Sequence, residues 1–78
     1  MLENFQPQFG TQIVVVKNVP YTLVQTDPDD PWSITRGETL IGSLYRPDGG
    51  GWAVWPMLDA CTYIPRAATP GEALRQAL

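Results

Sequence analysis

The sequence predicts an α+β fold: a small antiparallel sheet of four to five strands packed by one short C-terminal helix. Apolar or alternating runs of strand length recur along the chain, separated by turn residues. A Pro-Asp-Gly-Gly-Gly turn at residues 47–51 separates two of these runs, and Thr-Pro-Gly-Glu at residues 69–72 opens a helix. With 78 residues, the chain forms one small domain (residues 1–78) and has no room for a second core.

The first part of the chain predicts a β-hairpin at residues 12–26, after a loop-like segment at residues 1–11. Residues 12–17 are rich in β-branched side chains, and their near-continuous apolarity indicates burial on both faces, or a partner on the second face. Residues 18–20 are expected to break this strand before residues 21–26 return. The prolines and aspartates of residues 27–31 exclude regular structure, so we interpret this segment as a linker between two parts of the sheet.

Residues 32–78 predict a β-β-β-α unit. Residues 32–35 alternate between apolar and polar side chains, which predicts a strand. A turn follows, and residues 39–46 are expected to form a second strand antiparallel to the first. Alternation then places Leu40, Gly42 and Leu44 on one face of this strand and Ile41, Ser43 and Tyr45 on the other. Gly42 inside a strand indicates a bulge or a close neighbour, for which we expect an aromatic ring.

The remaining elements are a third strand and the helix. Residues 52–57 predict the strand, and residues 61–64 are a candidate for one more short edge strand. Thr69 is expected to cap the helix, and Glu72 to bond back to the cap. The apolar stripe that would pack on the sheet consists of Ala73, Leu74, Ala77 and Leu78.

Composition argues against catalysis, and we expect the protein not to be an enzyme. The chain has no histidine and a single cysteine, so an internal disulfide, a cysteine-based zinc cluster and the usual proton shuttle are excluded. The nucleophiles Ser33, Ser43 and Cys61 therefore lack a histidine to activate them. The aspartates at residues 27–30 lack the ligand spacing of a calcium loop, and the glycine triplet lacks the Lys-Ser/Thr of a phosphate loop. We predict no catalytic residue, cofactor or metal.

Charge and hydropathy limit the partners. The net charge is −3, all of it within residues 1–31, whereas residues 32–78 are neutral. An acidic chain is repelled by phosphate backbones, so nucleic-acid binding is disfavoured. No stretch approaches the roughly 20 apolar residues that span a bilayer. We therefore expect no membrane association, and the absence of a signal-like start together with the single cysteine favours the cytoplasm.

Aromatic and arginine side chains are the candidate partner-binding residues. Trp32 and Trp52 are expected in the core, where tryptophan supplies large burial in a small domain. The candidates for an outward sheet face are Trp55, Tyr45, Arg36, Arg46 and Arg66. Trp, Tyr and Arg dominate the hot spots of protein interfaces, and they also suit stacking on nucleic-acid bases.

One stretch of the chain is similar to a known family. Gly-Ser-Leu-Tyr-Arg at residues 42–46, the glycine turn with Trp-Ala-Val at residues 52–54, and Thr69 before Glu72-Ala73 carry the likeness. Together they resemble the arm-type DNA-binding domain at the N-terminus of many tyrosine integrases. The resemblance implies a three-stranded sheet plus a helix, a sheet that enters the DNA major groove, and Arg36 and Arg46 as DNA contacts. The neutral charge of residues 32–78 departs from that family's basic sheet.

The sequence therefore predicts a non-catalytic protein-binding module, acting by stoichiometric binding through an outward sheet face or an exposed strand edge. Its size and composition are typical of an accessory or inhibitor protein of a phage or mobile element. Two alternatives stay open. One is an integrase arm-type-like DNA-binding domain, and the other is a structural homo-oligomer or homodimer in which residues 13–16 pair between copies.

Overall fold

The computed structural model describes residue 2 and residues 4–78, which form one antiparallel sheet and one C-terminal helix. The strands are β1 (Gly10–Val16), β2 (Val19–Gln25), β3 (Trp32–Arg36), β4 (Thr39–Tyr45), β5 (Trp52–Pro56) and β6 (Ile64–Ala67), and the helix is α1 (Pro70–Ala77). The predicted α+β class is confirmed. The strand count is six rather than the predicted four to five.

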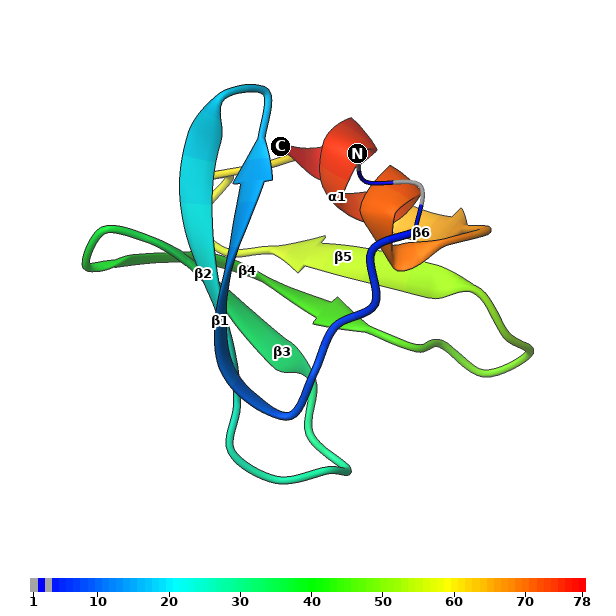
Figure 1. Cartoon of the computed structure of the whole chain (residues 1–78). Coiled ribbons are helices and arrows are strands. Elements are labelled where there is room, and N and C mark those ends of the chain that lie inside the picture. The colour runs from blue at the N-terminus through cyan, green and yellow to red at the C-terminus, as the bar shows by residue number, and fades with distance from the viewer. Residues whose placement is uncertain (1, 3) are drawn as a thin grey trace.

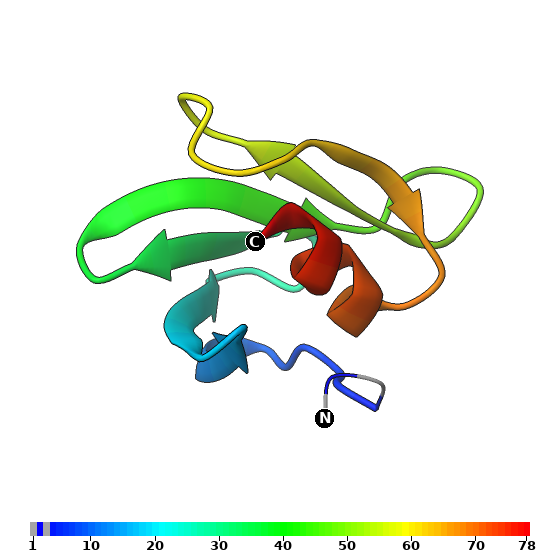
Figure 2. The same cartoon turned by 90° about the horizontal axis from the view of Figure 1, so that it is seen from above.

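Strand order in the sheet follows chain order, and each strand pairs antiparallel with the next. The sheet is strongly curved: the β1–β2 hairpin turns away from the plane of β3–β5 (Figures 1 and 2). The helix lies in the hollow of this curve and packs on β4, β5 and β6.

The first hairpin turns at Lys17 and Asn18, which both have positive φ (52° and 67°). Such a two-residue turn matches the right-handed twist of the flanking strands. The break predicted at residues 18–20 is present, but it lies at residues 17–18, because Val19 and Pro20 already belong to β2. Pro20 is tolerated in this strand. Val16 and Val19, which flank the turn, form a hydrogen-bonded pair, and the next pair, Val15 and Pro20, does not exchange hydrogen bonds. The nitrogen of Pro20 therefore points away from β1, where no donor is needed.

The segment at residues 27–31 is a loop between adjacent strands, not the predicted linker between two parts of the sheet. Leu23 of β2 pairs directly with Ile34 of β3, so the sheet is continuous across the loop. The buried side chain of Gln25 holds the loop in place, since its Nε2 donates to the Asp30 carbonyl at 2.8 Å. The buried side-chain amide of Gln25 thus supplies a hydrogen bond to the loop, where the prolines prevent hydrogen bonds between strands.

The core lies between the hollow face of the sheet and α1. Its fully buried large side chains include Leu23, Ile34, Leu44, Val54 and Leu74. Trp32 and Trp52 pack against this core at its edge, with ring centroids 5.7 Å apart, and both are only half-buried. Alternation of buried and exposed positions thus accounts for most of the sheet.

Strand β4 departs from simple alternation. The register between β3 and β4 shifts between Ile34 and Thr35, which leaves Ile41 as an extra residue beside Gly42. Ile41 consequently turns into the core together with Leu44, while Leu40 is exposed, whereas the prediction placed Leu40, and not Ile41, on the same face as Leu44. The bulge expected at Gly42 is present. Its close neighbours are the carbonyl of Trp55 and the sulfur of Cys61, and not an aromatic ring.

The last strand and the helix also differ in detail from the prediction. The final strand is Ile64–Ala67 and not residues 61–64, and it contains Pro65, which costs little in an outermost strand. The hydroxyl of Thr69 accepts a hydrogen bond from the Glu72 amide at 3.1 Å, so the predicted cap is confirmed. The carboxylate of Glu72 accepts from Gln76 instead of bonding back to the cap. Ala73, Leu74 and Ala77 are buried, as predicted.

The N-terminal segment crosses the open side of the core. Leu2 and Phe5 pack against the core, and the carbonyl of Gln8 accepts a hydrogen bond from the Trp32 indole at 2.9 Å. The Leu2 backbone passes so close to Gly71 that a β-carbon at residue 71 would collide with the Leu2 carbonyl. Leu2 and residues 4–9 therefore run across the core from the start of the helix to the start of the first strand.

Replacement of the helix cap, Thr69→Ala, should lower the free energy of unfolding by about 1 kcal/mol, because an amide of the first turn loses its acceptor. Thr69→Ser keeps the oxygen and serves as the control. Urea denaturation followed by circular dichroism measures both. Equal stability of the Ala and Ser variants would show that the cap contributes nothing.

Gly42→Ala should destabilise the protein by about 1–3 kcal/mol, as overpacking typically does. The added β-carbon would lie 2.8 Å from the Trp55 carbonyl oxygen and 3.1 Å from the Cys61 sulfur. Ser43→Ala on the same strand adds no atom and should change stability far less. Thermal unfolding of the two variants tests this, and a Gly42→Ala protein as stable as wild type would contradict the close approach.

Candidate functional site

Four exposed apolar side chains belong to the end of β5 and to the loop after it, and we call them the Trp55 patch. They are Trp55, Met57, Leu58 and Tyr63, with exposed fractions of 54%, 37%, 98% and 48%. The rings of Trp55 and Tyr63 pack edge to face, with centroids 5.3 Å apart. This geometry is favourable for an aromatic pair and holds both rings in place without burying them.

Strand alternation explains why Trp55 is exposed. Its neighbour Val54 faces the core and is completely buried, so Trp55 must point to the outer face of the sheet. Its cross-strand partner is Ser43, which is too small to cover an indole ring. Trp55 therefore lies on the outer face, as predicted, and its role in binding a partner stays a prediction.

The loop that carries Met57 and Leu58 is held at both ends by the main chain. The Met57 amide donates to the Ile41 carbonyl at 3.0 Å, and the Thr62 amide donates to the Ala77 carbonyl at 3.0 Å. Between these anchors, Leu58 and Asp59 adopt left-handed backbone conformations, with φ of 53° and 59°. Such a conformation costs a residue other than glycine about 1–3 kcal/mol, and residues in such conformations are concentrated at functional sites.

The outer face of the sheet beside the patch carries no charged side chain along two complete rows. The cross-strand register gives one row as Thr11, Val24, Ser33, Ser43 and Trp55, and the next as Ile13, Thr22, Thr35 and Leu40. Most of these side chains are small hydroxyl-bearing or β-branched ones. The Trp55 patch thus forms the bulky end of a neutral surface.

The three candidate arginines are not gathered around Trp55. The guanidinium of Arg46 lies 5.2 Å from the ring centroid of Trp52. Arg66 donates to the carbonyls of Gly50 (2.6 Å) and Asp48 (2.7 Å), so it clamps the glycine turn. Arg36 ends β3 next to the β3–β4 turn and is exposed. The structure therefore separates residues that the sequence grouped as one site.

By register, Tyr45 belongs to the same face as Trp55. It pairs with Ala53, and this pair lies two residues along each strand from the pair of Ser43 and Trp55. Its side chain instead lines a cavity of about 480 Å³, whose other walls are Gln25, Pro28, Asp29, Asp30, Pro31, Trp32 and Arg46. Tyr63, by contrast, was not among the predicted site residues. It precedes the buried Ile64, and the alternation of a strand starting there would have predicted its exposure.

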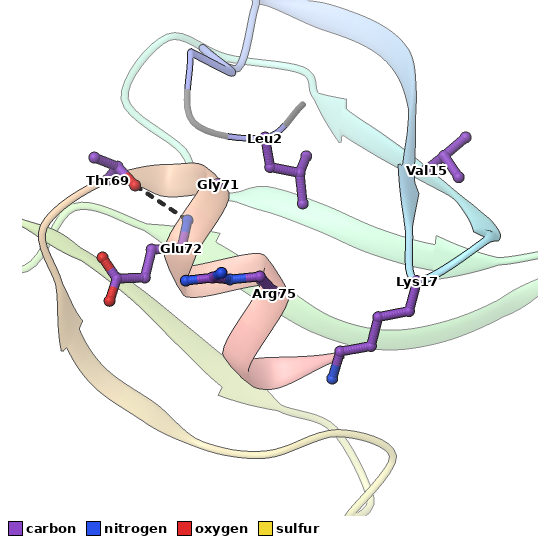
Figure 3. Close-up of a pocket in the computed structure, with 7 residues that line it drawn as sticks. All are labelled: Leu2, Val15, Lys17, Thr69, Gly71, Glu72 and Arg75. Carbon is purple, nitrogen blue, oxygen red and sulfur yellow. Dashed lines mark hydrogen bonds between the residues drawn. The ribbon is translucent and has the colours of Figure 1, made fainter.

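A second cavity, of about 490 Å³, lies between β1 and the start of α1 (Figure 3). Its walls are Leu2, Val15, Lys17, Thr69, Gly71, Glu72 and Arg75. Lys17 reaches from the end of β1 toward the helix, whereas Val15 points away from it (Figure 3). The cavity is lined by apolar groups together with charges of both signs.

In residue 2 and residues 4–78, no three His, Cys, Asp or Glu side chains come together as metal ligands. No helix in this part of the chain is long and apolar enough to cross a membrane. The Cys61 thiol donates to the Ile41 carbonyl at 3.4 Å, and burial raises the pKa of this thiol.

The raised pKa predicts that Cys61 reacts slowly with iodoacetamide near pH 8 in the folded protein, because the thiolate is the nucleophile. The folded chain also holds this proton more tightly than the unfolded chain. The thiol therefore stabilises the fold below its unfolded pKa, and this contribution is lost as the pH rises through the folded pKa. Alkylation rates in native buffer and in urea test this, and equal rates would contradict it.

Comparisons with known proteins gave no relative. The sequence matches no protein-family model, and neither curated proteins nor solved structures gave a significant match. The function of this chain is accordingly argued from its own surface.

Proposed function

We propose that this protein is a non-catalytic, cytoplasmic protein-binding module that acts by stoichiometric binding through the Trp55 patch. The observation that carries the proposal is the exposed edge-to-face pair of Trp55 and Tyr63 beside the fully exposed Leu58. An accessory or inhibitor role, in which the bound module occludes or bridges its partner, fits a chain of 78 residues.

The patch has the composition of an interface hot spot. Trp and Tyr are enriched among residues whose truncation costs more than 2 kcal/mol, and such residues lie together where water is excluded on binding. The packed pair loses little side-chain freedom when a partner covers it, because each ring already restrains the other. A partner that fits would present an apolar pocket to these rings.

The neutral rows beside the patch favour a protein over a nucleic acid. Binding to duplex DNA depends on phosphate contacts from Lys and Arg. Arg46 already lies over Trp52, Arg66 is hydrogen-bonded to two carbonyls, and Arg36 lies apart from both. An integrase-like use of Arg36 and Arg46 is the alternative that the experiment below also tests.

Trp55→Ala should abolish capture of the partner from extracts of the cells that produce this protein, while leaving the fold intact. Loss of a hot-spot side chain raises the dissociation constant by about 30-fold or more. Because Trp55 is 54% exposed and outside the core, the melting temperature should change little. Affinity capture with quantified stoichiometry, followed by titration of the captured protein, makes the measurement.

Phe9→Ala is the matched control, since Phe9 is also an exposed aromatic residue (63%) and is not part of the patch. A partner that is lost with Trp55→Ala and retained with Phe9→Ala supports the proposal. A partner that Trp55→Ala retains at full affinity refutes the role of the patch. Binding to duplex DNA at low salt that Arg36→Ala or Arg46→Ala weakens would replace it with the DNA-binding alternative.

A further inference from the structure

Strand β1 lies at an edge of the sheet and pairs only with β2. The Lys17–Asn18 turn makes Val16 and Val19 a hydrogen-bonded pair, and hydrogen-bonded pairs alternate along an antiparallel ladder. The remaining residues of β1 that bond to β2 are therefore Gly10, Gln12 and Val14. The amides and carbonyls of Thr11, Ile13 and Val15 consequently point to the free edge.

The two outer strands of this sheet are protected very differently. Strand β6 is short, contains Pro65 and Arg66, and pairs irregularly with β5, and all three features discourage pairing with another chain. Strand β1 has seven residues, with neither a proline nor a charge. Two of its side chains, Ile13 and Val15, are 71% and 56% exposed.

We propose that two copies of this chain associate through β1, antiparallel about a twofold axis at Ile13, so that the two sheets become one. Residues 13–16 are apolar on both faces of the strand, and only the face of Val14 and Val16 is buried within a single chain. A second copy would cover Ile13 and Val15 and would bond the free edge. This association is separate from partner binding at the Trp55 patch.

One register uses all the free groups of β1. With Ile13 opposite Ile13 of the second copy, Thr11 lies opposite Val15 and Val15 opposite Thr11. These three pairs form about six backbone hydrogen bonds, two for each pair. On the outer face the two Ile13 side chains become direct neighbours at the axis, and each Val15 contacts a threonine. Like charges do not meet, because the two Lys17 residues lie at opposite ends of the pairing.

The same register brings two further features together. Beyond Val15, Lys17 lies level with Phe9 of the second copy. Phe9 is 63% exposed in the single chain. Val15 and Lys17 border the cavity of about 490 Å³ between β1 and α1 (Figure 3). The pairing therefore brings this exposed aromatic residue close to Lys17 of the other copy, once on each side of the axis.

The cavity also shows that the free edge is accessible. The second half of β1 borders this cavity through Val15, which is 56% exposed. Among the described residues, no strand pairs with β1 on the side away from β2 (Figure 1). The backbone groups of Ile13 and Val15 are therefore available to an added strand.

Sedimentation equilibrium of the full chain at about 100 μM tests the proposal, since association depends on chain concentration. Wild type should give twice the single-chain mass. Ile13→Lys places two like charges side by side at the axis and should give the single-chain mass. Val15→Pro removes an amide that points to the free edge, so it should also dissociate the dimer while leaving the β1–β2 ladder intact.

Two controls separate dissociation from misfolding. Thr22→Lys adds the same charge on the same face, directly across from Ile13 but on the inner strand β2, and should remain dimeric. Ile13→Lys mixed with Ile13→Glu should regain the dimer mass, because opposite charges then meet at the axis. Trp55→Ala should stay dimeric, so this proposal can fail or hold independently of the proposed function.

Several results would overturn the proposal. A wild-type chain that sediments as a monomer excludes the dimer. A dimer that survives both Ile13→Lys and Val15→Pro uses another surface. Failure of the Lys and Glu variants to associate when mixed excludes the Ile13 axis, and a wild-type mass above two chains excludes a closed twofold pair.

Discussion

Burial of one face of α1 in the hollow of the sheet is the constraint on which the structure depends. A chain of 78 residues has one core, and Leu74, Ala73 and Ala77 supply the helix's share of it. An isolated helix of eight residues is not stable in water, so α1 exists because the curved sheet receives it. The register shift beside Gly42 is of the kind that bends a strand, and the missing β-carbon of Gly42 leaves room for the Trp55 carbonyl and the Cys61 sulfur.

The local signals of the sequence predicted much of this fold. The first hairpin, the glycine turn, the Thr69 cap and the buried stripe of α1 all follow from short-range chemistry. Two errors have one cause, which is contact between distant residues. Ile41 turns inward because the register shifts opposite Ile34, and residues 27–31 are an ordinary loop because β2 pairs with β3. The alternation of apolar and polar residues in one sequence does not show where the register between two strands shifts, or which strands pair.

The candidate site was predicted less completely than the fold. Trp55 was placed correctly because its neighbour Val54 had to face the core. The arginines were grouped with Trp55 by residue type alone, yet Arg46 and Arg66 are engaged by Trp52 and by turn carbonyls. These partners lie 6 to 18 positions away in sequence, and only the folded chain brings them together. The neutral outer rows likewise emerge only when the five strands β1 to β5 are set in register.

The contact between Leu2 and Gly71 has a consequence for the order in which the molecule assembles. Each strand of the sheet pairs with its neighbour along the chain, so every ladder closes a short loop, and topologies of this kind fold quickly. The Leu2–Gly71 contact instead joins segments that are far apart in the sequence. It closes a much longer loop than any strand pairing does, at a higher cost in entropy, so we expect it to form after the sheet and the helix. During synthesis on a ribosome, Leu2 can therefore reach its place only after Gly71 has emerged.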